Sequence, residues 1–460
     1  MCRFTACYSL AFSAATHFFL MLRNSIRLPV SELRPGMFVA ALDRDWRETA
    51  FPLQGFRIDD AGELEKLRAQ CAWVTIDPTH SASGSFEHLP DLHVAEKRFD
   101  SSSWLQRLRD RFARFAQASQ KVAEERARLG LLPPDVVPVL YGDVRPIDEE
   151  LRNAEAVYQK ADVALERITR QVANGETVDL DVVGGAVENM VESAIANPDA
   201  LLWVARIREE DGATCAHAIK VAVYLLQLGR HLGFPPAELG NLGAIGLSLD
   251  LGKNRVDRNL LLKKDKLTAA EFTHVKQHVA LGLAALEQAG TMHSDVRDGI
   301  AQHHERLNGS GYPRGLAAGE IGIYGRMAAI ADSFAALTTH RPYAAPRPAY
   351  DALKLLHEEC GTRYSPALVE QFVQAIGVFP AGSLVELSSG EVATVLAHNR
   401  VRRIEPRVLV LTDTAKKPIY EPISLDLVLQ PKAADGSDIK IVRGLPAGAH
   451  GLDLRRFYFA

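Results

Sequence analysis

The stretch His303-His304-Glu305-Arg306-Leu307-Asn308-Gly309-Ser310-Gly311-Tyr312-Pro313 is the most informative part of this chain. It places two adjacent imidazoles before a glycine-rich turn, and we expect Asn308-Gly309 to end the helix that carries the imidazoles. Imidazole is a ligand of transition metals, and glycine allows a backbone to approach a bound molecule closely. The stretch therefore predicts a metal centre beside a loop that accepts a phosphate ligand. The structural alternative is a tight turn after a helix.

Outside this stretch, further imidazole and carboxylate groups fall on apolar faces of predicted helices. His217 is in line with Val221 and Leu228, so its side chain points inward. We place His278 on a helix that the capping-box pattern Thr268-Ala269-Ala270-Glu271 opens. The complete inward-facing set is His217, Asp250, His278, His303, His304 and Asp332.

Taken together, these six side chains predict a metal site more strongly than any one of them does. A single inward histidine is usually a hydrogen-bonded core residue, and a single buried aspartate can pair with arginine or cap a helix. Several unpaired buried carboxylates are costly, and a divalent cation offsets that cost. Imidazole with carboxylate suits iron, manganese or zinc better than calcium or copper.

The composition narrows the class of protein. With 460 residues the chain should hold two to four domains, and its net charge of −4 argues against a partner that is a nucleic-acid polymer. A small anionic ligand needs only a few local cations and is compatible with that charge. The five cysteines are scattered, which fits a reducing cytoplasm and offers no disulfide framework.

The N-terminal residues allow two interpretations. Residues 4–22 are nearly free of charge and approach the length of a membrane span, so they could anchor the chain in the inner membrane. Alternatively, translation begins at Met21 and the preceding apolar extension is an artefact. We favour the second interpretation, and with it a cytoplasmic protein, because a globular pattern starts directly afterwards.

The remaining patterns divide the chain into segments. After the extension at 1–24 we predict a small β-rich domain at 25–95, a helical linker at 96–178, an all-α domain at 179–378, a small β module at 379–430 and a flexible tail at 431–460. In the β-rich domain, strand patterns fall in 26–39 and at 51–58 and 74–76, with a short helix around Leu64 and Leu67. In the β module they fall at 384–387, 392–395 and 408–411.

The predicted helix at 147–172 has an apolar seam with heptad spacing. The seam consists of Ile147, Leu151, Ala154, Tyr158, Ala161, Leu165, Ile168 and Val172. Such spacing is typical of a coiled coil, which here would form a homodimer. One face of a bundle within the chain would produce the same pattern, and both alternatives stay open.

The order of the inward-facing residues resembles the HD-GYP cyclic di-GMP phosphodiesterases. The matching motifs are His217, Asp250-Leu251-Gly252-Lys253, His278, His303-His304-Glu305, Gly311-Tyr312-Pro313, Asp332 and Arg341-Pro342-Tyr343. The resemblance covers about residues 180–378. Residues 25–90 resemble a domain of unknown function that is often fused ahead of this one, and the C-terminal β module resembles extensions of these proteins.

The resemblance implies an all-α core, a bi- or trinuclear centre with iron or manganese, and hydrolysis of cyclic di-GMP to linear dinucleotide or GMP. Asp250 would bridge two metals, His217 and Asp332 would hold one, and His278, His303 and His304 would hold the other or a third. Lys253 would neutralise a phosphate, and Arg341 would grip one, unless these cations are a solvated helix end and a surface ion pair. Gly309, Gly311 and Tyr312 would shape the ligand wall. Diguanylate cyclases are the implied protein partners.

The chain departs from the family pattern at four positions. Leu249 stands where the family has the histidine of its His-Asp dyad, and Leu249 has no donor atom. Ala335 and Ala344 replace a carboxylate and a cation, and Ala213 replaces an acidic residue of members with three metals, so we expect two metals at most. His274 is a weak substitute candidate for the lost ligand. Two hypotheses follow: a phosphodiesterase with weakened metal binding, or an inactive scaffold that binds a cyclic dinucleotide or a protein.

Overall fold

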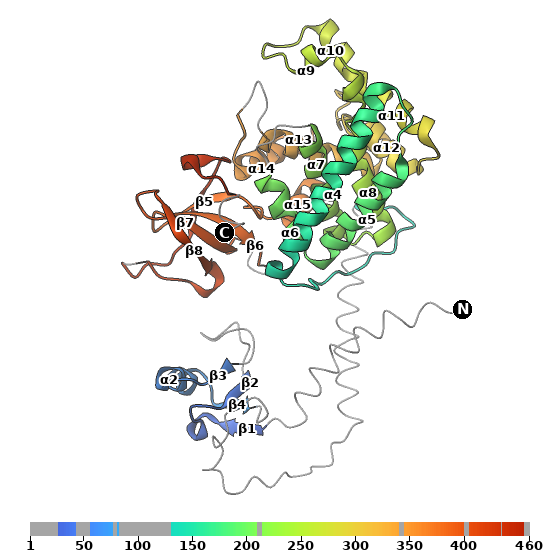
Figure 1. Cartoon of the computed structure of the whole chain (residues 1–460). Coiled ribbons are helices and arrows are strands. Elements are labelled where there is room, and N and C mark those ends of the chain that lie inside the picture. The colour runs from blue at the N-terminus through green and yellow to red at the C-terminus, as the bar shows by residue number, and fades with distance from the viewer. Residues whose placement is uncertain are drawn as a thin grey trace, which may run out of the picture. The chain divides into compact units, whose positions relative to one another are not determined.

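The computed structural model describes residues 26–42, 56–76, 81, 130–208, 214–339, 345–399, 404–433 and 435–454. The chain forms two compact units, residues 1–107 and 108–460 (Figure 1). Each unit has its own hydrophobic core, and we describe each by itself.

The first unit contains a four-stranded antiparallel sheet in the order β1-β4-β2-β3. Its elements are β1 (Ile26–Pro29), η1 (Val30–Glu32), β2 (Phe38–Leu42), β3 (Phe56–Arg57), α2 (Ala61–Gln70) and β4 (Trp73–Ile76). Asp60 caps α2 by accepting a hydrogen bond from the backbone N–H of Glu63 at 2.8 Å. Alternate residues of the strands and Leu67 of α2 fill a small apolar core. The predicted β-rich pattern is therefore confirmed where the structure describes it.

The second unit is built mainly of helices, as the sequence predicted. They are α4 (Ile147–Asn174), α5 (Leu180–Ala196), α6 (Pro198–Ile207), α7 (Thr214–Leu232), α8 (Pro236–Ser248), η4 (Leu251–Arg255), α9 (Arg258–Leu261), α10 (Ala269–Lys276), α11 (His278–Ala289), α12 (Ser294–Gln302), η5 (Ala318–Glu320), α13 (Ile323–Thr338), α14 (Ala349–Glu358) and α15 (Pro366–Ile376). Helices α4–α8 and α11–α15 share one continuous apolar core. Figure 1 shows how these helices pack together.

Helix α4 uses its heptad seam within the chain. All eight seam residues from Ile147 to Val172 are buried in the core that α5, α6 and α7 share. The last turn is also tied to η4, because Arg255 Nε donates a hydrogen bond to the carbonyl of Val172 at 3.1 Å. The bundle interpretation is therefore confirmed, since neighbouring helices of the same chain occupy the seam. A coiled-coil dimer cannot use this seam, and a homodimer through another face of residues 147–172 stays a prediction. A seam specifies only an apolar partner, not whether that partner lies in the same chain.

The second unit ends in a five-stranded antiparallel sheet in the order β8-β7-β6-β5-β9. The strands are β5 (Leu384–Leu387), β6 (Val392–Ala397), β7 (Arg407–Thr412), β8 (Pro418–Asp426) and β9 (Ile441–Leu445), with short helices η6 (Leu427–Leu429) and η7 (Ala449–Gly451). The flexible tail expected at 431–460 is a wrong prediction for β9, which pairs with β5 along its length. As an edge strand β9 keeps Val442 62% exposed, so its sequence lacks a clear buried pattern.

A buried pair of hydrogen-bonded side chains fixes this sheet to the helices. His398, which follows β6, donates its backbone N–H to Asp199 Oδ2 at 2.8 Å, and its ring Nδ1 lies 2.8 Å from Asp199 Oδ1. Asp199 is the second residue of α6 and is 2% exposed. The sheet is thus an integral part of the second unit.

None of the helices in the described part of the chain has both the length and the apolarity that crossing a bilayer requires. Residues 4–22, for which a membrane anchor was one expectation, lie outside the described residues.

Candidate metal centre

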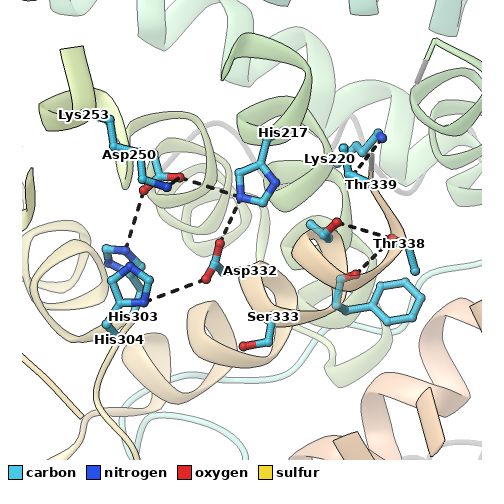
Figure 2. Close-up of polar contacts among 12 residues, drawn as sticks. His217, Lys220, Asp250, Lys253, His303, His304, Asp332, Ser333, Thr338 and Thr339 are labelled. Atoms are coloured by element: carbon cyan, nitrogen blue, oxygen red, sulfur yellow. Dashed lines mark hydrogen bonds and ion pairs between the residues drawn. The ribbon is translucent and has the colours of Figure 1, made fainter. Parts of the chain in front are cut away.

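Six side chains from five segments of the second unit converge at one place. They are His217 on α7, Asp250 between α8 and η4, His278 at the start of α11, His303 and His304 directly after α12, and Asp332 on α13. Figure 2 shows His217, Asp250, His303, His304 and Asp332 among them. The structure thus brings together all six residues that the sequence predicted as ligands. Among them Asp250, His278, His303 and Asp332 are buried, and the side chains of His217 and His304 are only 12% and 16% exposed.

Asp250 lies at the middle of the group. Its Oδ2 atom accepts a hydrogen bond from Lys253 Nζ at 2.6 Å and lies 3.7 Å from His217 Nε2. Its Oδ1 atom lies 3.4 Å from His278 Nε2 and 4.0 Å from His303 Nε2. The two carboxylate oxygens therefore face two different sets of imidazoles.

Two candidate ligand sets share this aspartate. One consists of His217, Asp250 and Asp332, and the other of Asp250, His278, His303 and His304; within each set the donor atoms lie within 4.8 Å of one another. In the first set His217 Nε2 lies 2.9 Å from Asp332 Oδ1. A carboxylate shared between two sets can bind two neighbouring cations at once.

The hydrogen bonds of two histidines fix their tautomers. The Nδ1 atom of His278 donates to the carbonyl of Val275, and that of His303 donates to the carbonyl of Ile300, both at 2.7 Å. Each ring then presents the lone pair of Nε2 toward Asp250, as metal-bound histidines do. Within the described ranges, His278 Nε2, His303 Nε2 and Asp250 Oδ1 are buried and have no hydrogen-bond partner. Three acceptors that face one another without a donor are unfavourable unless a cation lies between them, so the residues fit a divalent metal.

The pKa shifts indicate which of these side chains are charged near pH 7. Burial lowers the pKa of His278 to about 4 and lowers the pKa values of His303 and His304, so all three rings are neutral near pH 7. Burial alone would raise the pKa of Asp250, but the charge of Lys253, whose Nζ atom lies 2.6 Å from Oδ2, outweighs burial and lowers that pKa. The centre therefore combines neutral imidazoles with ionised carboxylates.

Two glycines allow η4 and α11 to approach closely. A Cβ atom on Gly252 would overlap the carbonyl of His278 and the backbone nitrogen of Gly282. Because Gly252 is two residues from Asp250 and its contact is the first residue of α11, this approach sets the spacing between the aspartate and His278. Gly252 was part of the predicted motif but had no predicted role.

The glycine-rich loop folds back onto the adjacent histidines. A Cβ atom on Gly311 would overlap the backbone of Glu305, and the N–H of Tyr312 donates to the carbonyl of His304 at 3.2 Å. The Tyr312 ring lies 4.4 Å from the His304 ring, and Gly309 has a positive φ of 75°. The loop thus forms one wall beside the centre.

Glu305 anchors this loop, a role that the sequence did not reveal. Its carboxylate is 1% exposed and accepts hydrogen bonds from the N–H groups of Arg314 at 2.8 Å and Leu316 at 2.9 Å. Lys220, one turn after His217, was also missed: it is 1% exposed and donates to Thr339 Oγ1 at 3.1 Å (Figure 2). A charged residue at a buried position is visible in the sequence only once its helix face is known.

Two helix boundaries differ from the prediction. The capping box at Thr268 is present, but α10 ends at Lys276 and His278 begins the next helix. Helix α12 ends at Gln302 rather than at Asn308-Gly309. In both places a histidine Nδ1 atom binds the carbonyl three residues before it, and this bond competes with continuation of the helical ladder.

The remaining predicted residues are not drawn into the centre. His274 is exposed and belongs to neither ligand set. Leu249 is fully buried in the apolar core and supplies no donor atom, and Ala335 is likewise buried. Arg341, Ala344 and Ala213 lie outside the described residues.

Comparison with known proteins identifies related sequences along most of the chain. A family model described as an HD domain matches residues 202–368, and one described as a domain of unknown function (DUF3391) matches residues 25–183. A cyclic di-GMP phosphodiesterase of Pseudomonas aeruginosa is 30% identical over 399 residues, which are 86% of this chain and 88% of the relative.

Two further relatives match shorter parts of the chain. A cyclic di-GMP phosphodiesterase of Thermotoga maritima is 41% identical over 126 residues, which are 27% of this chain and 34% of the relative. A 3'3'-cGAMP-specific phosphodiesterase of Vibrio cholerae is 34% identical over 167 residues, which are 36% of each chain. These two matches cover about a third of each relative.

Proposed function

Because the chain belongs to the HD-GYP family of cyclic di-GMP phosphodiesterases, we propose that it binds cyclic di-GMP or a related cyclic dinucleotide at the Asp250 centre and hydrolyses it. The observation that carries the proposal is the meeting of three buried acceptors, Asp250 Oδ1, His278 Nε2 and His303 Nε2, none with a donor among the described residues. A helical scaffold without a ligand would gain nothing from this arrangement.

The six converging residues would hold two divalent cations, iron or manganese. His217 and Asp332 would bind one ion, His278, His303 and His304 the other, and Asp250 would bridge them. When bound, the cations would polarise the phosphoryl oxygens and make a nucleophile available from water at neutral pH. Leu249 leaves the first set with three protein ligands, so we expect weaker metal binding there.

The protein's own residues would position the dinucleotide. Lys253 reaches the centre as a point cation, and its bond to Asp250 would be exchanged for a phosphate oxygen. Arg341 would hold a phosphate through its guanidinium. Gly309, Gly311 and Tyr312 would form the wall against which the ligand lies, and Glu305 keeps that wall in place. Hydrolysis adds one water across a P–O bond and gives the linear dinucleotide; a second hydrolysis gives GMP.

A second candidate function rests on Leu249. Leu249 stands where the family pattern has the dyad histidine, and its aliphatic side chain is buried. Losing a ligand or its outer-shell partner costs roughly 10- to 100-fold in metal affinity or activity. The alternative is therefore a protein that binds a cyclic dinucleotide, or a partner such as a diguanylate cyclase, without cleaving it. With either function we propose a cytoplasmic protein.

Anaerobic assay of the iron- or manganese-loaded chain against cyclic di-GMP separates the two candidates. We expect conversion to linear dinucleotide or GMP, with chromatographic detection, and loss of conversion in Asp250→Ala. Calorimetry on the same samples measures binding. Binding without turnover above the Asp250→Ala control would support the scaffold, and the absence of both would contradict either function.

A further inference from the structure

Helix α10 carries an aromatic ring, Phe272, and a cation, Lys276, outside the apolar core. None of the eight residues of α10 is buried, and Figure 1 shows α9 and α10 projecting beyond the other helices. Nevertheless Phe272 on this helix is 42% exposed, although a phenyl ring in water is unfavourable. Phe272 is therefore not a core residue of this unit.

Phe272 lies directly outside the metal centre. Its ring centroid is 5.9 Å from that of Tyr312, at an interplanar angle of 84°. The Tyr312 ring in turn lies 4.4 Å from the ring of His304, one of the candidate ligands. The contacts thus run from the metal centre through His304 and Tyr312 to Phe272. An edge-on contact does not stack the two rings, and part of the Phe272 ring stays accessible.

Lys276 adds an unpaired cation at the same place. Its Nζ atom lies 4.6 Å from the Phe272 centroid and 5.2 Å from the Tyr312 centroid. Among the described residues, no carboxylate forms an ion pair with Lys276. By contrast, Lys263 nearby is paired with Glu271 at 2.7 Å. The Lys276 ammonium therefore has donor capacity that a ligand can use.

We propose that Phe272 and Lys276 form a subsite for a guanine base of the cyclic dinucleotide; this inference rests on the proposed function. Bases stack on accessible aromatic rings, and lysine donates to the O6 and N7 acceptors of guanine. Adenine carries an amino donor in place of O6, so Lys276 favours guanine. In a dinucleotide the ribose separates base from phosphate. The base of a nucleotide whose phosphate lies at the Asp250 centre therefore falls beside the centre, where Phe272 lies.

Calorimetry on the metal-loaded full chain tests this subsite with hydrolysis-resistant phosphorothioate analogues of cyclic di-GMP and cyclic di-AMP. Phe272→Leu keeps an apolar side chain but removes the ring, and we expect affinity for both analogues to fall about 5- to 100-fold. Phe272→Tyr keeps the ring and should retain the affinity of the wild type. Lys276→Met keeps the length of the side chain but removes the donor; it should weaken the guanine analogue about 5- to 100-fold and the adenine analogue less, because adenine offers N7 but not O6. The matched control is Lys266→Met, at an exposed lysine between α9 and α10, which should change neither affinity.

The outcomes separate this inference from the proposed function. If the wild type binds the cyclic di-GMP analogue and the Phe272→Leu and Lys276→Met variants bind it equally well, the subsite is overturned and the proposed function stands. If the wild type binds neither analogue, both are overturned. Metal content and melting temperature are measured for every variant. A weaker affinity that comes with loss of bound metal would assign Phe272 to holding the Tyr312 loop, which also overturns the subsite.

Discussion

The Nε2 atom of His278 lies 3.4 Å from Oδ1 of Asp250, although neither atom has a proton to share. The imidazole has committed its proton to the carbonyl of Val275, and the carboxylate is ionised. Two buried acceptors at this separation repel each other, and the fold maintains the contact through the close approach of Gly252 to α11. The relationship is stabilising only with a cation between the two atoms, which is the basis of the predictions below.

Restoring a donor atom at position 249 should strengthen the centre. We predict that Leu249→His raises metal affinity about 10- to 100-fold and raises any phosphodiesterase activity with it. Without metal, the new imidazole is buried with no cation to bind, so the melting temperature should fall. Added manganese should restore the melting temperature. Thermal unfolding with and without metal measures the fall in melting temperature and its recovery.

The control for this variant is Leu249→Met, which nearly conserves volume. It should leave metal affinity unchanged. Equal metal affinities of the His variant and the Met variant would show that position 249 does not face the metal.

The stability of the metal-free protein should fall in a defined pH window. Burial lowers the pKa of His278 from 6.5 to about 4. The unfolded chain therefore takes up a proton at this residue as the pH falls through 6.5, while the folded chain does so only near pH 4. The stability that neutral His278 contributes is complete above pH 6.5 and is lost as the pH falls to about 4, by about 3 kcal/mol.

Urea unfolding of the metal-free chain between pH 7 and pH 4 measures this dependence. His278→Asn removes the titrating group and should flatten the curve, with the part due to His303 and His304 remaining. Identical curves for the wild type and His278→Asn would contradict the assignment of a neutral buried imidazole at 278.

The contact between Gly252 and α11 should be essential to the centre. In Gly252→Ala the new methyl group overlaps the carbonyl of His278, so η4 must move away and take Asp250 with it. We predict a loss of about 1–3 kcal/mol of unfolding free energy together with loss of metal binding.

Gly240 provides the matched control. It lies within α8, and a Cβ atom there has no neighbour within 4 Å. Gly240→Ala should therefore retain metal and stabilise the protein by about 0.5–1 kcal/mol. Similar effects of the two substitutions on metal binding would remove the positioning role of Gly252.

The sequence predicted the six converging residues because local patterns carry their signal. His217 lies on an apolar face, and the two histidines at 303 and 304 precede a glycine-rich turn, so residue type and spacing were sufficient. The sequence did not predict the roles of Glu305 and Gly252, because each role depends on contacts with another segment that only folding brings near. Glu305 accepts from backbone N–H groups nine and eleven residues away, and Gly252 is needed because α11 packs against it.

The wrong boundaries have a similar origin. Helices α10 and α12 end where a histidine ring binds a carbonyl of the preceding turn, and propensity does not include such bonds. The seam of α4 was correctly identified as buried, but its spacing did not distinguish a partner helix in the same chain from one in a second copy. Strand β9 was missed because an edge strand has little apolar alternation.

The metal content of the purified full-length chain, by elemental mass spectrometry alongside Asp250→Asn, tests the central claim most directly. Because Asp250 belongs to both ligand sets, we expect up to two ions of iron or manganese per wild-type chain, one for each set. The isosteric Asp250→Asn should lose much of the metal from both sets. Wild-type protein that carries no more metal than Asp250→Asn, after loading with either ion, would contradict it.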